Sequence, residues 1–179
     1  MLTWHIATEY CSIASSNEEA DQMHHRQQEK VKLENYQQVT ATLSKYCAYL
    51  MFFIPELLPG NSTDTTFVLH DMMLEGCRLL GKGKTSRDEL LNIIANSESS
   101  SDNNIEHTIF VRGLKLGRDL EKEDVVLCWK VMAEFWAETI IYIAPSDNVT
   151  AHMERLAQGG EFLTHVWALL THAGILKHV

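Results

Sequence analysis

Apolar side chains recur every three or four residues along most of this chain, and this spacing constrains its fold more than any other feature. Residues 39–54 show it clearly, with one apolar face made of Val39, Leu43, Tyr46 and Leu50. An α-helix turns once in about 3.6 residues, so these positions line up and can pack against a neighbour. No stretch combines strand-like alternation with β-branched residues and turn signals on both sides. The sequence therefore predicts an all-α fold.

The composition favours one compact domain. The chain has 179 residues, is 45% hydrophobic, and contains only 9 Gly and 3 Pro. This composition excludes collagen-like, Pro/Gly-rich and globally disordered classes. The helical pattern is broken at Pro55, Pro145, the Gly159–Gly160 pair and Gly174. We predict a single irregular bundle of about seven or eight helices that spans residues 1–179.

Two polar segments are predicted to lie outside the helices. Residues 15–38 are polar and mixed in charge, which favours a loop or linker that grades into the next helix. Residues 97–104 read Ser-Glu-Ser-Ser-Ser-Asp-Asn-Asn, and this low-complexity composition favours a mobile loop.

Residues 121–144 form the most apolar helical segment. Their polar stripe is narrow and consists of Lys130, Glu134 and Glu138, each four residues apart. A helix that is apolar around most of its circumference is buried. We therefore predict that 121–144 is the longest helix and the one around which the others pack, and that 161–173 is an ordinary amphipathic helix.

The charge balance and the lengths of the apolar runs exclude several classes of partner. Lys and Arg total 15 against 24 Asp and Glu, a formal charge of -9, which argues against binding nucleic acid or an anionic membrane surface. The longest apolar run ends before Pro55 and is far shorter than the roughly 18 to 20 residues that a membrane span needs. The N-terminus lacks the features of a signal peptide, and the four cysteines form no Cys-x-x-Cys pair. We expect a cytoplasmic chain with free thiols and no membrane span.

The sharpest set of candidate metal ligands is Glu161, His165 and His172. Their spacings of four and seven residues place them on one line of one helix, a geometry that can hold a divalent metal. His5 and Glu9, also four apart, would add ligands if the first and last helices were neighbours. A metal held there would lower the pKa of bound water and promote hydrolysis. A metal-dependent hydrolase is thus the alternative hypothesis.

The same residues have a simpler interpretation. All three positions on the last helix lie on its polar face, where Glu and His need no special role, and the chain contains no His-Glu-x-x-His motif. No Ser or Cys nucleophile lies on a recognisable sharp turn. The sequence therefore favours a non-enzymatic protein with no catalytic residue and no cofactor.

Several segments, in order along the chain, resemble one protein family. Residues 2–11 read Leu-Thr-Trp-His-Ile-Ala-Thr-Glu-Tyr-Cys, residues 43–51 read Leu-Ser-Lys-Tyr-Cys-Ala-Tyr-Leu-Met, and residues 159–167 read Gly-Gly-Glu-Phe-Leu-Thr-His-Val-Trp. Together they resemble the plant family that contains the domain of unknown function 594, which usually follows the domain of unknown function 4220. The Gly-Gly-Glu block is the most specific part, and Glu9 stands where the family usually has Asp.

The resemblance implies a place in a larger protein rather than an activity. Family members typically carry several transmembrane helices upstream, so this chain resembles their soluble C-terminal region. No activity is established for the family, so the resemblance identifies no catalytic residue. The leading hypothesis is a helical interaction or regulatory module of a plant membrane-associated protein, at the cytosolic face of a membrane, that binds an unknown protein partner through the face containing Glu161, His165 and His172.

Overall fold

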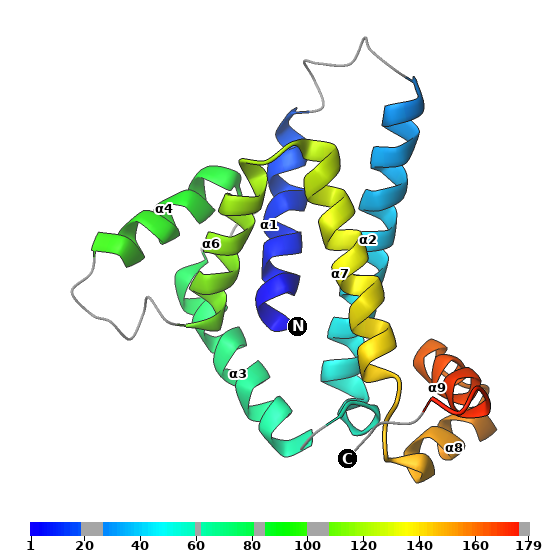
Figure 1. The fold of residues 1–179 in the computed structure, drawn as a ribbon. Helices are drawn as coiled ribbons and strands as arrows, with labels where there is room; N and C mark the ends of the chain where they lie inside the picture. The colour runs from blue at the N-terminus through cyan, green and yellow to red at the C-terminus, as the bar shows by residue number, and fades with distance from the viewer. Residues whose placement is uncertain (19–26, 60–61, 81–84, 100–107, 176–179) are drawn as a thin grey trace.

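The computed structural model describes residues 1–18, 27–59, 62–80, 85–99 and 108–175. Within these ranges the chain forms eight α-helices, one 3-10 helix and no strand, which confirms the predicted all-α fold (Figure 1). The elements are α1 (Leu2–Glu18), α2 (Gln27–Phe53), the 3-10 helix η1 (Pro55–Leu57), α3 (Ser62–Leu79), α4 (Arg87–Ser99), α6 (Ile109–Glu121), α7 (Val125–Ile143), α8 (Val149–Ala157) and α9 (Phe162–His172). Over the same ranges, every helix is too short or too polar to cross a membrane.

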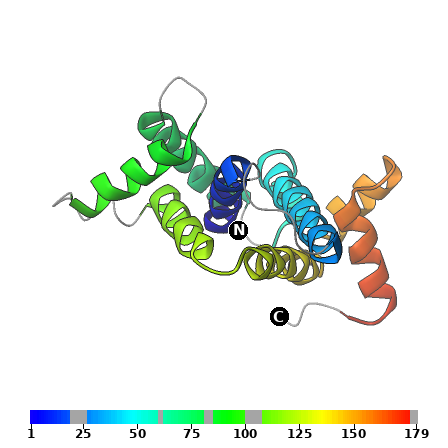
Figure 2. The ribbon, with the colours of Figure 1, turned by 90° about the horizontal axis from the view of Figure 1, so that it is seen from above.

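Helix α1 lies at the centre of the arrangement, with α6 on one side and α7 and α2 on the other (Figures 1 and 2). The most extensive helix pairs are α1 with α6 and α2 with α7. Helices α3 and α4 lie beyond α6, and α8 and α9 lie beyond α2 and α7 (Figure 2). The prediction that the segment 121–144 forms the centre is therefore wrong, because α1 occupies that place.

Two glycines allow α1 and α6 to approach closely. A Cβ atom at Gly113 would lie 2.5 Å from the Cβ of Ile6, and one at Gly117 would lie 2.8 Å from the ring of Tyr10. Any larger residue would force the two helices apart, so both glycines serve packing within a continuous helix rather than interrupting it.

The buried apolar side chains form two clusters. The first cluster joins α1, α4, α6 and the first half of α7, and contains Tyr10, Ile94, Val111, Leu114, Trp129 and Met132. The second cluster joins the end of α2, η1, the second half of α7, α8 and α9, and contains Leu50, Ile54, Leu57, Trp136, Ile140 and Leu163. Helix α7 contributes to both clusters, as its apolar sequence predicts.

The predicted helix 121–144 begins later in the structure. Helix α6 ends at Glu121, and α7 begins at Val125 because the carboxylate of Asp124 accepts a hydrogen bond from the Leu127 N–H at 3.0 Å. The longest helix is α2, with 27 residues against 19 in α7.

The predicted polar loop 15–38 is also largely wrong. Helix α1 continues to Glu18 and α2 begins at Gln27, so only residues 19–26 of that segment lie outside the described residues. Sparse apolar residues are sufficient for a helix here because Leu33 and Tyr36 pack against the first cluster.

The predicted loop at 97–104 begins within a helix. Residues 97–99 belong to α4, and residues 100–104 lie outside the described part of the chain. The Ser97 hydroxyl donates to the Ile94 carbonyl at 2.7 Å and the Ser99 hydroxyl to the Ala95 carbonyl at 2.9 Å, so both serines hydrogen-bond to the helix backbone.

Candidate functional site

The Gly-Gly-Glu segment builds the beginning of α9. Gly159 and Gly160 have φ angles of 107° and 78°, in the left-handed region that glycine adopts without strain. Glu161 is the N-cap residue, and its N–H donates to the Thr164 hydroxyl at 2.9 Å. The ring of His165 packs over Gly160, where a Cβ atom would overlap it, and its Nδ1 lies 2.8 Å from the Glu161 carbonyl oxygen. This turn therefore depends on the specific residues of the segment.

Two tyrosines of α2 attach the beginning of α9 to the rest of the molecule. The Tyr46 hydroxyl accepts a hydrogen bond from the Leu163 N–H at 2.9 Å, and the Tyr49 hydroxyl donates to the Glu161 carboxylate at 3.1 Å. Burial raises the pKa of Tyr46 to about 12. The Leu163 N–H is one of the first N–H groups of α9, which have no acceptor within their own helix. Tyr46 thus replaces a missing helical partner.

The structure separates the candidate metal ligands into two groups. Glu161 and His165 lie together at the start of α9, whereas His172 is exposed at its end. His5 and Glu9 lie on α1, which is separated from α9 by α2 and α7 (Figures 1 and 2). Nowhere in the described ranges do three His, Cys, Asp or Glu side chains gather closely enough to hold a metal ion.

His5 takes part in helix packing. Its Nδ1 lies 2.7 Å from the hydroxyl of Ser44 on α2, and burial lowers the pKa of the imidazole. A neutral ring that shares a hydrogen bond with a buried serine is suited to joining two helices. The condition on which the five-residue metal site depended, that the first and last helices are neighbours, is not met.

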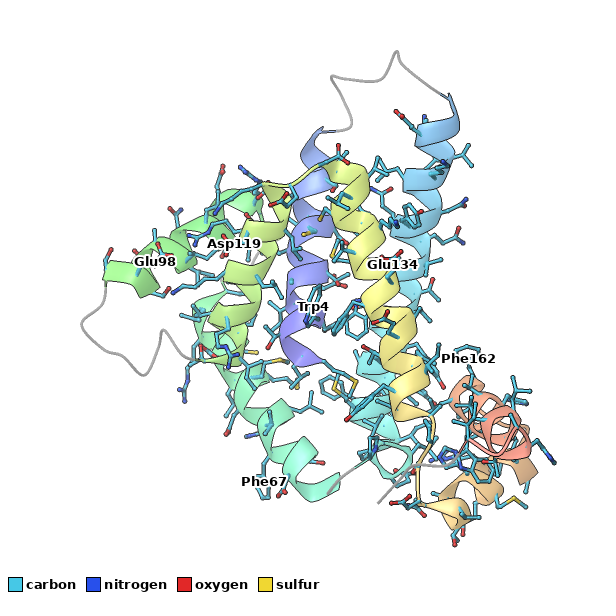
Figure 3. All side chains as sticks on the ribbon, viewed as in Figure 1. Trp4, Phe67, Glu98, Asp119, Glu134 and Phe162 are labelled. Carbon is cyan, nitrogen blue, oxygen red and sulfur yellow. The ribbon has the colours of Figure 1, made fainter. Side chains whose placement is uncertain are left out.

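A continuous row of aromatic side chains runs along α2 and onto α9. We call it the aromatic ladder: Phe162 meets Tyr46 edge to face at 5.7 Å between ring centroids, and the row continues through Tyr49, Phe53 and Phe52 at 6.2, 5.4 and 6.4 Å. Phe53 is 72% exposed and Phe162 is 53% exposed. Figure 3 places Phe162 on the side of the molecule where α8 and α9 lie.

Charged side chains border the aromatic ladder. Glu161 contacts it through the Tyr49 hydroxyl, and Glu56 of η1 accepts a hydrogen bond from Arg155 of α8 at 2.9 Å. The Asn148 side chain donates to the Glu56 carbonyl at 3.0 Å and its own Oδ1 caps α8 by accepting from the Ala151 N–H. The surface is therefore an aromatic centre with a polar border, the composition typical of protein interfaces.

A fully buried histidine lies between α8 and α9. His152 of α8 stacks on Trp167 of α9, with ring centroids 4.7 Å apart and an angle of 4° between the planes. Neither ring nitrogen of His152 has a hydrogen-bond partner among the described residues, and burial lowers its pKa. The Trp167 Nε1–H donates to the Ser146 carbonyl at 3.3 Å. The stack therefore joins α8 to α9 through a neutral imidazole.

Sequence reasoning found one end of this surface and missed the rest. Glu161 and His165 were identified as candidates, but the aromatic ladder and His152 were not. The spacing of Tyr46, Tyr49 and Phe53 at three and four residues is a visible signal for a shared helix face. It does not reveal that α9 adds Phe162 to that face while leaving it exposed.

These features define a class: an all-α domain whose last helix, docked by tyrosines, extends an exposed aromatic surface. Residues 121–175, which contain α7, α8 and α9, match the family described as protein of unknown function, DUF594. This match supports the DUF594 part of the resemblance over that segment. No curated protein and no solved structure matches the chain.

Proposed function

We propose that this domain is a non-enzymatic helical interaction module that binds a protein partner through the aromatic ladder and the adjoining start of α9. The observation that supports this function is the exposure of aromatic rings that contact one another, with Phe53 and Phe162 both more than half exposed. Contiguous exposed apolar groups with a polar border are characteristic of binding sites on soluble domains. Aromatic side chains also dominate the energetic centres of interfaces.

The charges around the aromatic ladder indicate what the partner carries. Glu161 contributes an acidic group at its edge, and the whole chain has a formal charge of -9. A partner that inserts an apolar side chain among the rings and presents Lys or Arg towards Glu161 would be complementary in both respects.

The family resemblance supplies a cellular setting for this proposal. In plant members of the family, transmembrane helices upstream would hold such a module at the cytosolic face of a membrane. Tethering raises the effective concentration of the module near membrane partners, so a moderate intrinsic affinity would be sufficient there.

The proposal is tested by capture from detergent-solubilised plant membranes with the tagged chain, quantified by mass spectrometry. A true partner is recovered by the wild-type chain, and Phe53→Ser and Phe162→Ser each reduce its recovery about tenfold. Phe67→Ser is the matched control, because Phe67 is 65% exposed on α3 and lies away from Phe162 (Figure 3). Circular dichroism checks that all three variants remain folded.

The edge of the surface is tested with Glu161→Gln, which removes the charge and retains a side chain able to accept from Tyr49. We expect weaker recovery of the same partner with little change in the free energy of unfolding. Equal recovery by the wild-type chain, both ladder variants and Glu161→Gln would show that this surface is not the interface.

A further inference from the structure

The contact between α8 and α9 encloses a titratable ring without polar partners. His152 is fully buried and lies parallel to the indole of Trp167, with 4.7 Å between the ring centroids. Both of its ring nitrogens lack a hydrogen-bond partner among the described residues. A neutral imidazole has one N–H donor and one acceptor, whereas the protonated ring has two donors and a positive charge. Enclosure without partners therefore penalises the protonated ring far more than the neutral one.

The charged groups on the elements around His152 are paired elsewhere or exposed. Helix α8 packs mainly against α9 and η1. The Glu56 carboxylate of η1 is bonded to Arg155, and the Glu161 carboxylate at the start of α9 is bonded to the Tyr49 hydroxyl. The other titratable groups of α8, α9 and the segment before α8 are exposed to solvent: Asp147, Glu154, His165 and His172. Burial alone lowers the pKa of His152, so a positive charge on this ring has no compensation.

Helix α9 is the element that is held most weakly at this contact. It has 11 residues, packs chiefly on α8 (Figure 1), and buries only Leu163, Thr164 and Trp167 within its length. A helix this short is not stable in isolation, so α9 loses its structure when it leaves the contact. Segments with few buried groups open locally at a lower free energy than the core does.

We propose that His152 is an acid-sensitive switch whose protonation releases α9 from α8 and α2. The proton comes from solvent and binds a ring nitrogen that regains contact with water when α9 opens, whereas the closed state retains the neutral ring beside Trp167. Release also carries Phe162 away from Tyr46 and so removes one end of the aromatic ladder. That consequence for binding rests on the proposed function, whereas the release of α9 does not depend on it.

The size of the effect follows from the titration of an exposed imidazole, whose ordinary pKa is about 6.5. The pKa is lower in the closed state than in the open state, so the closed state is fully favoured well above pH 6.5 and loses stability as the pH falls through 6.5. While the closed ring stays neutral, the ratio of open to closed molecules rises about tenfold between pH 7.5 and pH 5.5.

Amide hydrogen exchange of the whole chain measures this ratio without a partner. The chain is labelled at pH 7.5 and at pH 5.5, digested and analysed by mass spectrometry, with correction for the pH dependence of the chemical exchange rate. We expect the protection factor of α9 to fall about tenfold at pH 5.5 and to be lower there than that of α6. Unchanged protection of α9, or protection equal to that of α6 at pH 5.5, would overturn the proposal.

Three variants assign the response to one ring. His152→Phe retains a ring beside Trp167 but cannot take up a proton, so the protection of α9 should change less than about twofold between the two pH values. His165→Gln and His172→Gln remove the other imidazoles of α9 and should retain the tenfold fall. A fall that persists in His152→Phe, or that is lost in His165→Gln or His172→Gln, would contradict the assignment. Full recovery of the partner by Phe53→Ser and Phe162→Ser would instead refute the proposed function and leave the release of α9 standing.

Discussion

The α1–α6 pair and the α8–α9 pair are held by different kinds of contact. Helix α6 lies against α1 with backbones in close approach, because Gly113 and Gly117 leave no side chain between them. Helix α9 instead depends on individual side chains: tyrosines of α2 at its start and the His152–Trp167 stack along its length. The comparison indicates that the first pair is the rigid part of the domain, and that the second is positioned by a few replaceable groups at the exposed surface.

The largest expected effect is at the close helix contact. Gly113→Leu places a side chain where even a Cβ would lie 2.5 Å from Ile6 and 2.9 Å from the Thr3 carbonyl oxygen. We expect a loss of about 3 kcal/mol in the free energy of unfolding, measured by urea denaturation. Arg112→Leu, at the neighbouring exposed position of α6, is the control and should change it by less than about 0.5 kcal/mol. A small effect of Gly113→Leu would show that α1 and α6 are not tightly packed.

The second effect is at the attachment of α9. Tyr46→Phe removes the acceptor for the Leu163 N–H and should lower the free energy of unfolding by about 1 kcal/mol. Hydrogen exchange of the first N–H groups of α9 should accelerate, while α1 and α6 are unaffected. Tyr49→Phe is the matched control, because the Tyr49 hydroxyl bonds an exposed carboxylate and its loss should leave exchange in α9 nearly unchanged. Equal effects of the two variants would contradict the distinct role of Tyr46.

The third effect is a dependence on pH. Burial lowers the pKa of His152 below its unfolded value of 6.5, so the unfolded state takes up the proton first. The stabilisation is complete well above pH 6.5 and is lost as the pH falls through 6.5 towards the lower folded pKa. For one histidine that stays neutral when folded, the loss is at most about 0.8 kcal/mol at pH 6.

A variant separates the contribution of His152 from that of the partly buried His5. The pKa of His5 is also lowered, so both contribute with the same sign. His152→Phe retains a ring to stack on Trp167 and should flatten part of the dependence between pH 7.5 and 6, measured by urea denaturation at each pH. An unchanged slope would show that His152 is not buried as a neutral ring.

The smallest effect concerns the exposed polar stripe of α7. Lys130 lies 3.6 Å from Glu134, and both side chains are about half exposed. Surface pairs of this kind contribute little, so Lys130→Ala should change the free energy of unfolding by less than about 0.5 kcal/mol. A loss above 1 kcal/mol by urea denaturation would show that the stripe is buried against another surface.

Local patterns in the sequence predicted where the helices lie better than they predicted which helices pack against one another. The spacing of apolar residues identified the all-α fold and the buried faces of α7 and α9, since these depend only on the helical repeat. The polar start of α2 was missed because its stability comes from Leu33 and Tyr36 packing on distant elements. The start of α7 was predicted four residues too early because Glu121, Lys122 and Glu123 are compatible with a helix, whereas the helix begins only after Asp124, which caps it.

In the candidate site, too, the sequence predicted proximity within one segment but not contacts between helices. Glu161 caps the helix that contains His165, so their proximity follows from a spacing of four residues. The distance from α9 to His5 depends on which helices are neighbours, and no pattern within one helix specifies that. The exposure of Phe53 and Phe162 likewise results from how α9 docks on α2, which only the folded structure shows.

Hydroxyl-radical footprinting of the chain, with and without the partner recovered from membranes, tests the central claim most directly. In the free chain, Phe53, Phe162 and Phe67 should all be oxidised, because all three are more than half exposed. With the partner bound, Phe53 and Phe162 should be protected about tenfold while Phe67 remains unchanged. Continued oxidation of Phe53 and Phe162 at the free-chain rate in a saturated complex would contradict the claim that the aromatic ladder is the interface.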